Sequence, residues 1–154
     1  MISTLRLFLL KIQSVSRGPA TDETRKKTLL AARAAFEKKA TDLVVFEVSG
    51  ITTMADYFMI CSADSERQVR AVRDHIDATL SRNGFQPYST EGEKTLSWIL
   101  MDYSDLIVHI FKKDVRHHYG LERLWGDAPR LELEEDSAGT SSSGERNIRT
   151  AQGR

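Results

Sequence analysis

Two apolar runs, Leu43–Val48 (LVVFEV) and Tyr57–Cys61 (YFMIC), decide the fold class of this chain. Both have the length of a strand, and neither shows the regular alternation of apolar and polar residues that is typical when one face of a strand meets water. They therefore predict a sheet that is buried on both faces. The loop between them is too short for a helical crossover, so the two strands are either antiparallel neighbours or not adjacent.

A second pair of apolar runs predicts a β-hairpin. Leu96–Met101 and Leu106–Phe111 are joined by the short corner Asp102-Tyr103-Ser104-Asp105, which is typical of a tight connection between antiparallel strands. A weaker run, Phe85–Tyr88, contains Pro87, which cannot donate a hydrogen bond within a sheet. We therefore place this weak strand at an edge.

Helical periodicity before these strands predicts a first helix over residues 21–40. Four basic residues fall away from the apolar face, and they are Lys26, Lys27, Arg33 and Lys38. Apolar residues recur every three or four positions on one face, and they are Leu29, Ala32, Phe36 and Ala40.

Two further helices follow. The second begins at Ser65, whose hydroxyl stands at capping-box spacing from Gln68, and it ends at Asn83-Gly84. The third begins near Asp114, ends before Pro129 and contains Gly120, which weakens a helix; its large apolar residues are Val115, Tyr119, Leu121, Leu124 and Trp125. The order of elements predicts an α/β fold, in which a mixed sheet of about five strands is flanked by helices. The second helix has an apolar stripe, in which large apolar residues recur every three or four positions: Val69, Val72, Ile76 and Leu80.

Length and composition fit one globular domain. The chain has 154 residues, of which 40% are hydrophobic and 29% charged, and this balance excludes collagen-like and wholly disordered chains. Cys61 is the only cysteine, which excludes an intramolecular disulfide and a cysteine-built zinc site. No apolar run approaches the ~20 residues that a membrane-spanning helix needs, so we expect a soluble protein.

The chain divides into three parts. Residues 1–20 contain basic residues but no acidic residue, and we expect a disordered or leader-like extension there. Residues 21–133 carry all the predicted helices and strands. Residues 134–154 are rich in Ser, Gly and Arg without apolar periodicity, and we expect a disordered tail.

The charges are distributed unevenly, although 22 basic and 22 acidic residues give a net charge of zero. Residues 1–40 carry nine basic and three acidic residues, whereas residues 41–130 carry ten basic and 14 acidic residues. An acidic central region attracts cations and repels phosphates, so it suits docking on a basic protein. A basic helix such as 21–40 can lie along phosphates, but a solvated charged face is the more usual meaning of such a run.

The aspartates of the predicted corner raise the question of catalysis. Asp102 and Asp105, with Asp56 and Asp114, are the obvious carboxylates for a metal ion or for acid–base chemistry. Aspartate is also a common turn residue, because its side chain binds its own backbone, and we favour that interpretation. Nucleotide chemistry would need a glycine-rich phosphate loop, which the sequence does not contain.

The remaining chemistry-bearing residues favour structural roles. His117 and His118 are adjacent, so on a helix they point about 100° apart and cannot easily bind one metal ion. His109 lies in a strand between two apolar residues, and we expect it at the surface or in a satisfied hydrogen bond rather than acting as a base. Cys61 is expected in the core. We expect no metal site.

Large aromatic side chains gather in the C-terminal half beside acidic residues. Interfaces to basic proteins use this combination, because aromatic rings supply buried area and carboxylates supply orientation. A core that contains two tryptophans explains the same residues, and each ring fits a core at least as well. The aromatic residues are Trp98, Tyr103, Phe111, Tyr119 and Trp125, and their acidic neighbours are Asp102, Asp105, Glu122 and Asp127.

Several motifs occur in an order that points to a known family. They are Ala55–Ile60, Ser65–Val69, Trp98–Tyr103 and Asp105–Phe111, then Arg116, Tyr119, Leu121-Glu122, Leu124-Trp125 and Asp127-Ala128. Together they resemble the ribosomal silencing factor family, also called Iojap-like, over roughly residues 24–133. The chain departs from the family pattern at Ser104, where Gly is frequent, and at His118, where an aromatic residue is frequent.

The resemblance implies a nucleotidyltransferase-like fold without the catalytic motif, and therefore a protein that is not an enzyme and holds no cofactor. It also implies binding to the large ribosomal subunit through a basic ribosomal protein of the intersubunit face, so that the small subunit cannot join and translation is repressed. A role in large-subunit biogenesis is implied as well. Neither DNA nor a membrane is an expected partner, and a homodimer is left open. The implied location is the cytoplasm, or the mitochondrion if residues 1–20 are a presequence.

The densest family motif lies in the hairpin, so the resemblance places the partner contact there. Two alternatives stay open: a nucleotidyltransferase-like enzyme, which would turn over nucleotide with a metal ion, and a direct RNA-binding protein, which would hold naked ribosomal RNA with a steep salt dependence. The residues expected nearest the partner are Trp98, Asp102, Tyr103, Asp105 and His109, with Glu122 and Trp125 in support.

Overall fold

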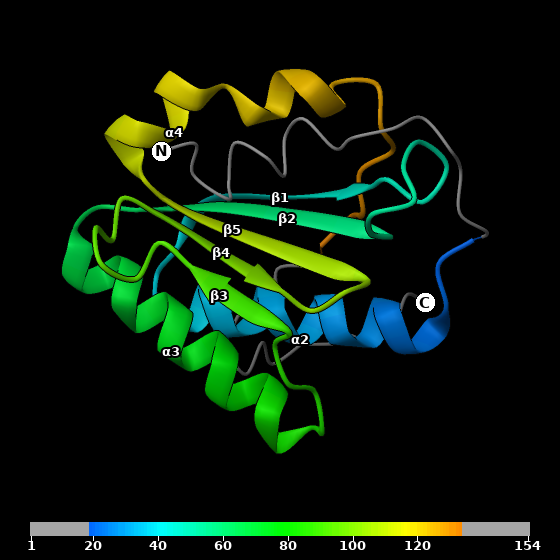
Figure 1. Cartoon of the computed structure of the whole chain (residues 1–154), viewed down its shortest axis with the longest axis horizontal. Coiled ribbons are helices and arrows are strands. Elements are labelled where there is room, and N and C mark those ends of the chain that lie inside the picture. Colours follow the sequence, from blue (N-terminus) through cyan, green and yellow to red (C-terminus); the bar gives the residue numbers. More distant parts are fainter. Residues whose placement is uncertain (1–18, 134–154) are drawn as a thin grey trace, which may run out of the picture.

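The computed structural model describes residues 19–133 and shows a sheet with helices on both faces (Figure 1). Helices α2 (Asp22–Glu37) and α3 (Glu66–Arg82) cover one face, whereas α4 (Lys113–Tyr119) and the 3-10 helix η1 (Leu121–Trp125) cover the other. The predicted α/β class is confirmed. The five strands are β1 (Thr41–Glu47), β2 (Tyr57–Ala63), β3 (Ser89–Glu91), β4 (Trp98–Asp102) and β5 (Leu106–Lys112).

The expected extension and the expected tail lie almost wholly outside the described residues, so the domain boundaries stay predictions. Within residues 19–133, no helix is both long enough and apolar enough to cross a membrane.

The sheet is mixed, with the strand order β1-β2-β5-β4-β3. β1 and β2 are antiparallel neighbours, which decides between the two arrangements that the short loop allowed. β4 and β5 form the predicted antiparallel hairpin, and β2 and β5 pair in parallel at the centre. All seven residues of β2 are buried, because strands lie on both of its sides and helices on both of its faces.

The sheet separates two apolar cores. Ile99 and Met101 of β4 face the core beneath α2 and α3, whereas Trp98 and Leu100 face the core beneath α4 and η1. This division follows from the two-residue period of a strand. Cys61 lies fully buried in the first core, as predicted, and burial raises the pKa of its thiol to about 12.

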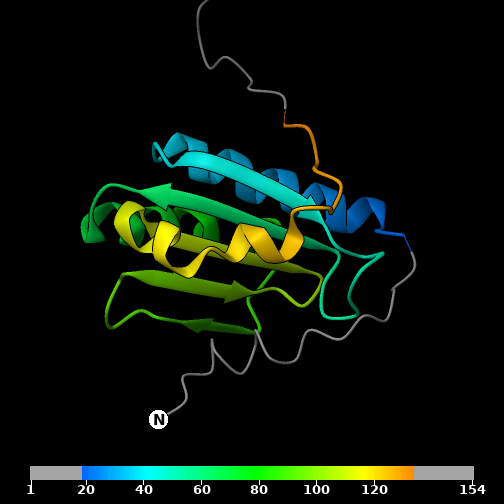
Figure 2. The same cartoon turned by 90° about the horizontal axis from the view of Figure 1, so that it is seen from above.

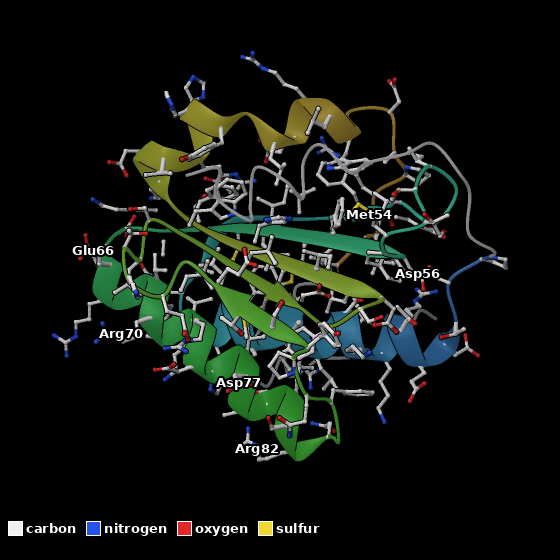
Figure 3. All side chains as sticks on the ribbon, in the orientation of Figure 1. Met54, Asp56, Glu66, Arg70, Asp77 and Arg82 are labelled. Atoms are coloured by element: carbon white, nitrogen blue, oxygen red, sulfur yellow. The ribbon has the colours of Figure 1, made fainter. Side chains whose placement is uncertain are left out.

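Helix α3 begins and ends as predicted. The amide of Gln68 donates to Ser65 Oγ over 3.2 Å, and Gln68 Oε1 accepts from the amide of Asp64 over 2.7 Å instead of returning to Ser65. Gly84, with a φ of +84°, follows its last turn. The four residues of the predicted stripe are fully buried. On the opposite, outer side, Figure 3 shows Glu66, Arg70 and Arg82 pointing away from the sheet.

The predicted apolar face of the first helix was only partly correct, because Ala32 and Ala40 are buried but Leu29 is not. α2 buries mainly small side chains, including Thr28, Ala31 and Ala35, whereas Leu29 is 40% exposed. Lys27, which was expected on the solvated side, is only 9% exposed. Alanines let the helix lie close to the sheet. Lys27 turns inward because its ammonium group pairs with the carboxylate of Asp105.

The weak strand and the last helix also differ from the prediction. The weak strand is Ser89–Glu91 rather than Phe85–Tyr88, although it does lie at the edge of the sheet. The last helix is not continuous: Gly120 adopts a left-handed conformation with φ of +55° and ends α4, after which η1 begins. Glycine adopts this conformation without steric cost, so here it redirects the helix rather than weakening it.

An ion pair joins α2 to the corner between β4 and β5. Lys27 Nζ lies 2.6 Å from Asp105 Oδ1, and the Thr24 hydroxyl donates to Asp105 Oδ2 over 2.7 Å. The two charged side chains are 11% and 22% exposed. Lys27 also lies over the ring of Phe85, 4.8 Å from its centroid. Because both charges are largely removed from water, each is stabilised mainly by the opposite charge of the other.

This dependence can be measured with a double-mutant cycle. We expect Lys27→Met and Asp105→Asn each to lower the free energy of unfolding by about 1–3 kcal/mol, because each leaves a buried partner without its counter-charge. The double variant should lose less than the sum, by about 0.5–2 kcal/mol. Urea unfolding gives all three values. Lys26→Met, at an exposed position next in the helix, is the control. Strict additivity of the two single effects would contradict the coupling.

Candidate functional site

The seven residues expected near the partner do not form one surface patch. Trp98, His109 and Trp125 lie in the core beneath α4 and η1 and are at most 5% exposed. Tyr103 lies in the opposite core and is 3% exposed. The partly exposed members are Asp102, Asp105 and Glu122. The sheet therefore divides the set between its two faces, and most of the seven side chains are buried.

An aromatic cluster forms the floor of the face that α4 covers. Trp98 Nε1 donates to His109 Nδ1 over 3.0 Å, which satisfies the expected hydrogen bond of His109. The rings of Phe111 and Tyr119 lie 4.9 and 4.6 Å from Trp98, centroid to centroid. His109 is fully buried rather than at the surface, and burial lowers its pKa to about 3. The imidazole is therefore neutral at physiological pH and holds Trp98 in place.

The corner between β4 and β5 is a turn stabilised by its own aspartate. Asp102 Oδ1 accepts from the amide of Ser104 over 2.7 Å, and Ser104 has a φ of +73°. The turn interpretation of Asp102 is confirmed. Burial raises the pKa of Glu91, and the nearby charge of Asp102 raises it further. Burial likewise raises the pKa of Tyr103, with the charge of Asp77 acting in the same direction.

The side chains of the two corner aspartates point to different partners and do not form one acidic site. Asp105 turns toward Lys27 and Thr24 on α2, whereas Asp102 binds the turn itself. Among residues 19–133, no three His, Cys, Asp or Glu side chains are placed to share a metal ion.

Arg116 fixes α4 and η1 onto the strands. Its guanidinium donates to Glu122 Oε1, to Asp42 O over 2.6 Å and to Ser62 Oγ over 2.8 Å. The Arg116 side chain is 12% exposed, whereas that of Glu122 is 43% exposed. Glu122, which was expected to support the partner contact, therefore holds Arg116. Sequence reasoning missed this role of Arg116, although the residue belongs to the motifs quoted for the family resemblance.

Two large apolar side chains on the same segment reach solvent. Tyr119 at the end of α4 is 51% exposed, and Leu124 in η1 is 56% exposed. Tyr119 rests on Trp98, so its ring stands on a rigid, buried base. We name these two exposed residues, Tyr119 and Leu124, the α4 surface; Trp98 lies beneath Tyr119. Sequence reasoning placed Leu124 in one continuous helix with Tyr119. Gly120, which interrupts that helix, was the signal that this side would change.

The buried state of His109 predicts how stability depends on pH. The unfolded chain binds a proton at His109 near its ordinary pKa of 6.5, whereas the folded protein binds it only near pH 3. The free energy of unfolding should therefore fall as the pH drops below the unfolded pKa, by up to about 1.4 kcal/mol per pH unit from this group.

Urea unfolding between about pH 7 and about pH 5 measures this slope. His109→Gln, which retains an acceptor for Trp98, should flatten it. The exposed His118→Gln should leave it unchanged. Equal slopes for the wild type and His109→Gln would remove His109 as the cause.

Comparison with known proteins agrees with this architecture. The family model described as ribosomal silencing factor during starvation matches residues 21–153. Ribosomal silencing factor RsfS of Bacillus subtilis is 42% identical over 105 residues, which are 68% of this chain and 89% of that protein. Protein Iojap of Zea mays chloroplasts is 34% identical over 106 residues, 69% of this chain and 46% of that protein. A crystal structure from Bacillus halodurans superposes with a TM-score of 0.64 at 36% identity and covers 71% of this chain and 99% of that one. The chain belongs to the ribosomal silencing factor family.

Proposed function

We propose that this protein binds the large ribosomal subunit through a basic ribosomal protein on the intersubunit face. Bound there, it obstructs the small subunit, so that ribosomes do not join and translation falls. The action is steric, with no bond made or broken and no cofactor. The cytoplasm is the proposed location, and assistance in large-subunit biogenesis is part of the same proposal.

The observation that carries the proposal is the α4 surface. Exposed aromatic and aliphatic side chains on a fixed base are what a protein partner buries at the centre of an interface. Tyr119 is held by Trp98, and its segment is anchored by Arg116, so little ordering is left to occur on binding. Membership of the ribosomal silencing factor family supports the ribosome as the partner.

Charge supports a basic partner. Residues 41–130 carry 14 acidic and ten basic residues. Asp127 is exposed just beyond η1, and Glu91 and Asp102 lie near each other at the β3–β4 edge. Such a distribution steers a positively charged surface toward this domain and raises the association rate.

The predicted hairpin residues take different parts in this proposal. Trp98 and His109 shape the α4 surface from beneath, and Trp125 supports η1. Asp102 is available for a rim contact. Tyr103 and Asp105 maintain the corner, so a change at Asp105 alters stability through Lys27 as well as any contact.

Co-sedimentation with isolated large subunits, small subunits and joined ribosomes tests the proposal. The wild type should be retained by large subunits and excluded from joined ribosomes. Leu124→Asp should weaken retention by about tenfold or more, because a charge enters the centre of the apolar contact. The matched control is Leu29→Asp, the same change at an exposed leucine of α2.

The comparison requires that both variants have the same urea midpoint of unfolding as the wild type. Equal retention of Leu124→Asp and wild type would move the contact away from the α4 surface. Absence of the wild type from every ribosomal fraction would reject silencing by large-subunit binding. Retention by naked ribosomal RNA with a steep salt dependence would favour direct RNA binding instead.

A further inference from the structure

A shallow groove lies on the outer face of α2, away from the α4 surface. Its volume is about 310 Å³, and exposed Leu29 lies within it. Three basic side chains and one acidic side chain surround this apolar centre. The groove therefore fits an acidic peptide segment better than a neutral or basic one. Among the described residues, its lining is Asp22, Arg25, Lys26, Leu29, Leu30 and Arg33.

The described part of the chain ends close to this groove. The amide of Glu47 donates to Pro129 O over 2.7 Å, and the amide of Leu131 donates to Val45 O over 2.9 Å, so residues 129–131 follow the outer edge of β1. Leu131 and Leu133 then pack against the core beneath α2, as Leu30 does. Figures 1 and 2 show this orange segment passing the edge of β1 and reaching the level of α2.

The next three residues are all acidic. Glu134, Glu135 and Asp136 follow Leu133 directly and lie outside the described residues. Three extended residues span about 10 Å. The seven-residue separation of Lys26 and Arg33 along a helix axis is also about 10 Å. Length and charge of the acidic run therefore match the basic side chains of the groove.

Strand geometry identifies the central residue of this run. Side chains alternate along an extended chain, so residue 135 shares a side with residues 131 and 133. Leu131 and Leu133 point to the core that α2 covers. This alternation favours Glu135, the middle residue of the acidic run, as the one to contact α2.

We propose that the groove on α2 is the docking site of this chain's own acidic segment 134–136, with Glu135 against the basic side chains of Lys26 and Arg33. Exposed ion pairs are weak one by one. Here the segment is tethered by Leu133, and a short tether gives an effective concentration on the order of millimolar or above. When docked, the acidic residues 134–136 cover the basic outer face of α2. The proposal concerns the isolated protein and stands independently of ribosome binding.

Carboxyl titration by NMR in the full chain tests the contact. The Glu135 carboxyl should titrate lower in the wild type than in Lys26→Glu/Arg33→Glu, by roughly 0.2–0.7 pH units, as expected of an exposed ion pair. Its backbone amide should also be rigid in the wild type and mobile in that variant. Glu145, nine positions beyond Asp136 in the same tail, is the internal control and should titrate alike in both proteins.

Two further variants separate a specific contact from general electrostatics. Arg67→Glu/Arg70→Glu makes the same charge change on the exposed face of α3 and should leave Glu135 unchanged. Adding Glu135→Lys to Lys26→Glu/Arg33→Glu should restore the rigid amide. Identical titration and mobility of Glu135 in the wild type and the α2 variant would overturn the proposal. So would an RNA oligonucleotide that shifts the α2 signals without releasing residues 134–136, because the groove would then be an RNA surface.

Discussion

Because β2 and β5 pair in parallel at the centre of the sheet, the chain between Ala63 and Leu106 has to leave the sheet and return. A tight turn cannot join parallel neighbours, so α3 carries the chain back along one face, and β3 and β4 then add the far side of the sheet. A central parallel pair must also be covered on both faces. The two cores, the helices above and below, and the division of β4 between those cores all follow from this pairing.

The features that sequence could predict are those that depend on nearby residues. Helix α3 was predictable because Ser65, Gln68 and Gly84 supply its ends and its buried stripe lies within one helix. The hairpin of β4 and β5 was predictable for the same reason. The inward position of Lys27 was not, because the carboxylate that draws it in lies 78 residues away. The parallel pairing of β2 and β5 likewise has no local signal.

The site shows a similar limit. Trp98, His109 and Trp125 belong to the motifs that carry the family resemblance, yet all three are buried in the core beneath α4 and η1 rather than exposed at the surface. Sequence alone does not tell a core aromatic from an exposed one. Tyr119 and Leu124 reach solvent because Gly120 ends α4 and changes the direction of the chain. The motifs of the family resemblance therefore identified mainly buried residues and not the exposed ones.

The segment that follows η1 has a further consequence for how this protein can associate. By hydrogen bonding along β1, residues 129–131 occupy backbone groups that an edge strand would otherwise present to another chain. At the opposite edge, β3 is only three residues long. Short or covered edges discourage strand-to-strand polymerisation. A partner, or a second copy of the chain, would therefore recognise side chains on the helical faces rather than extend the sheet.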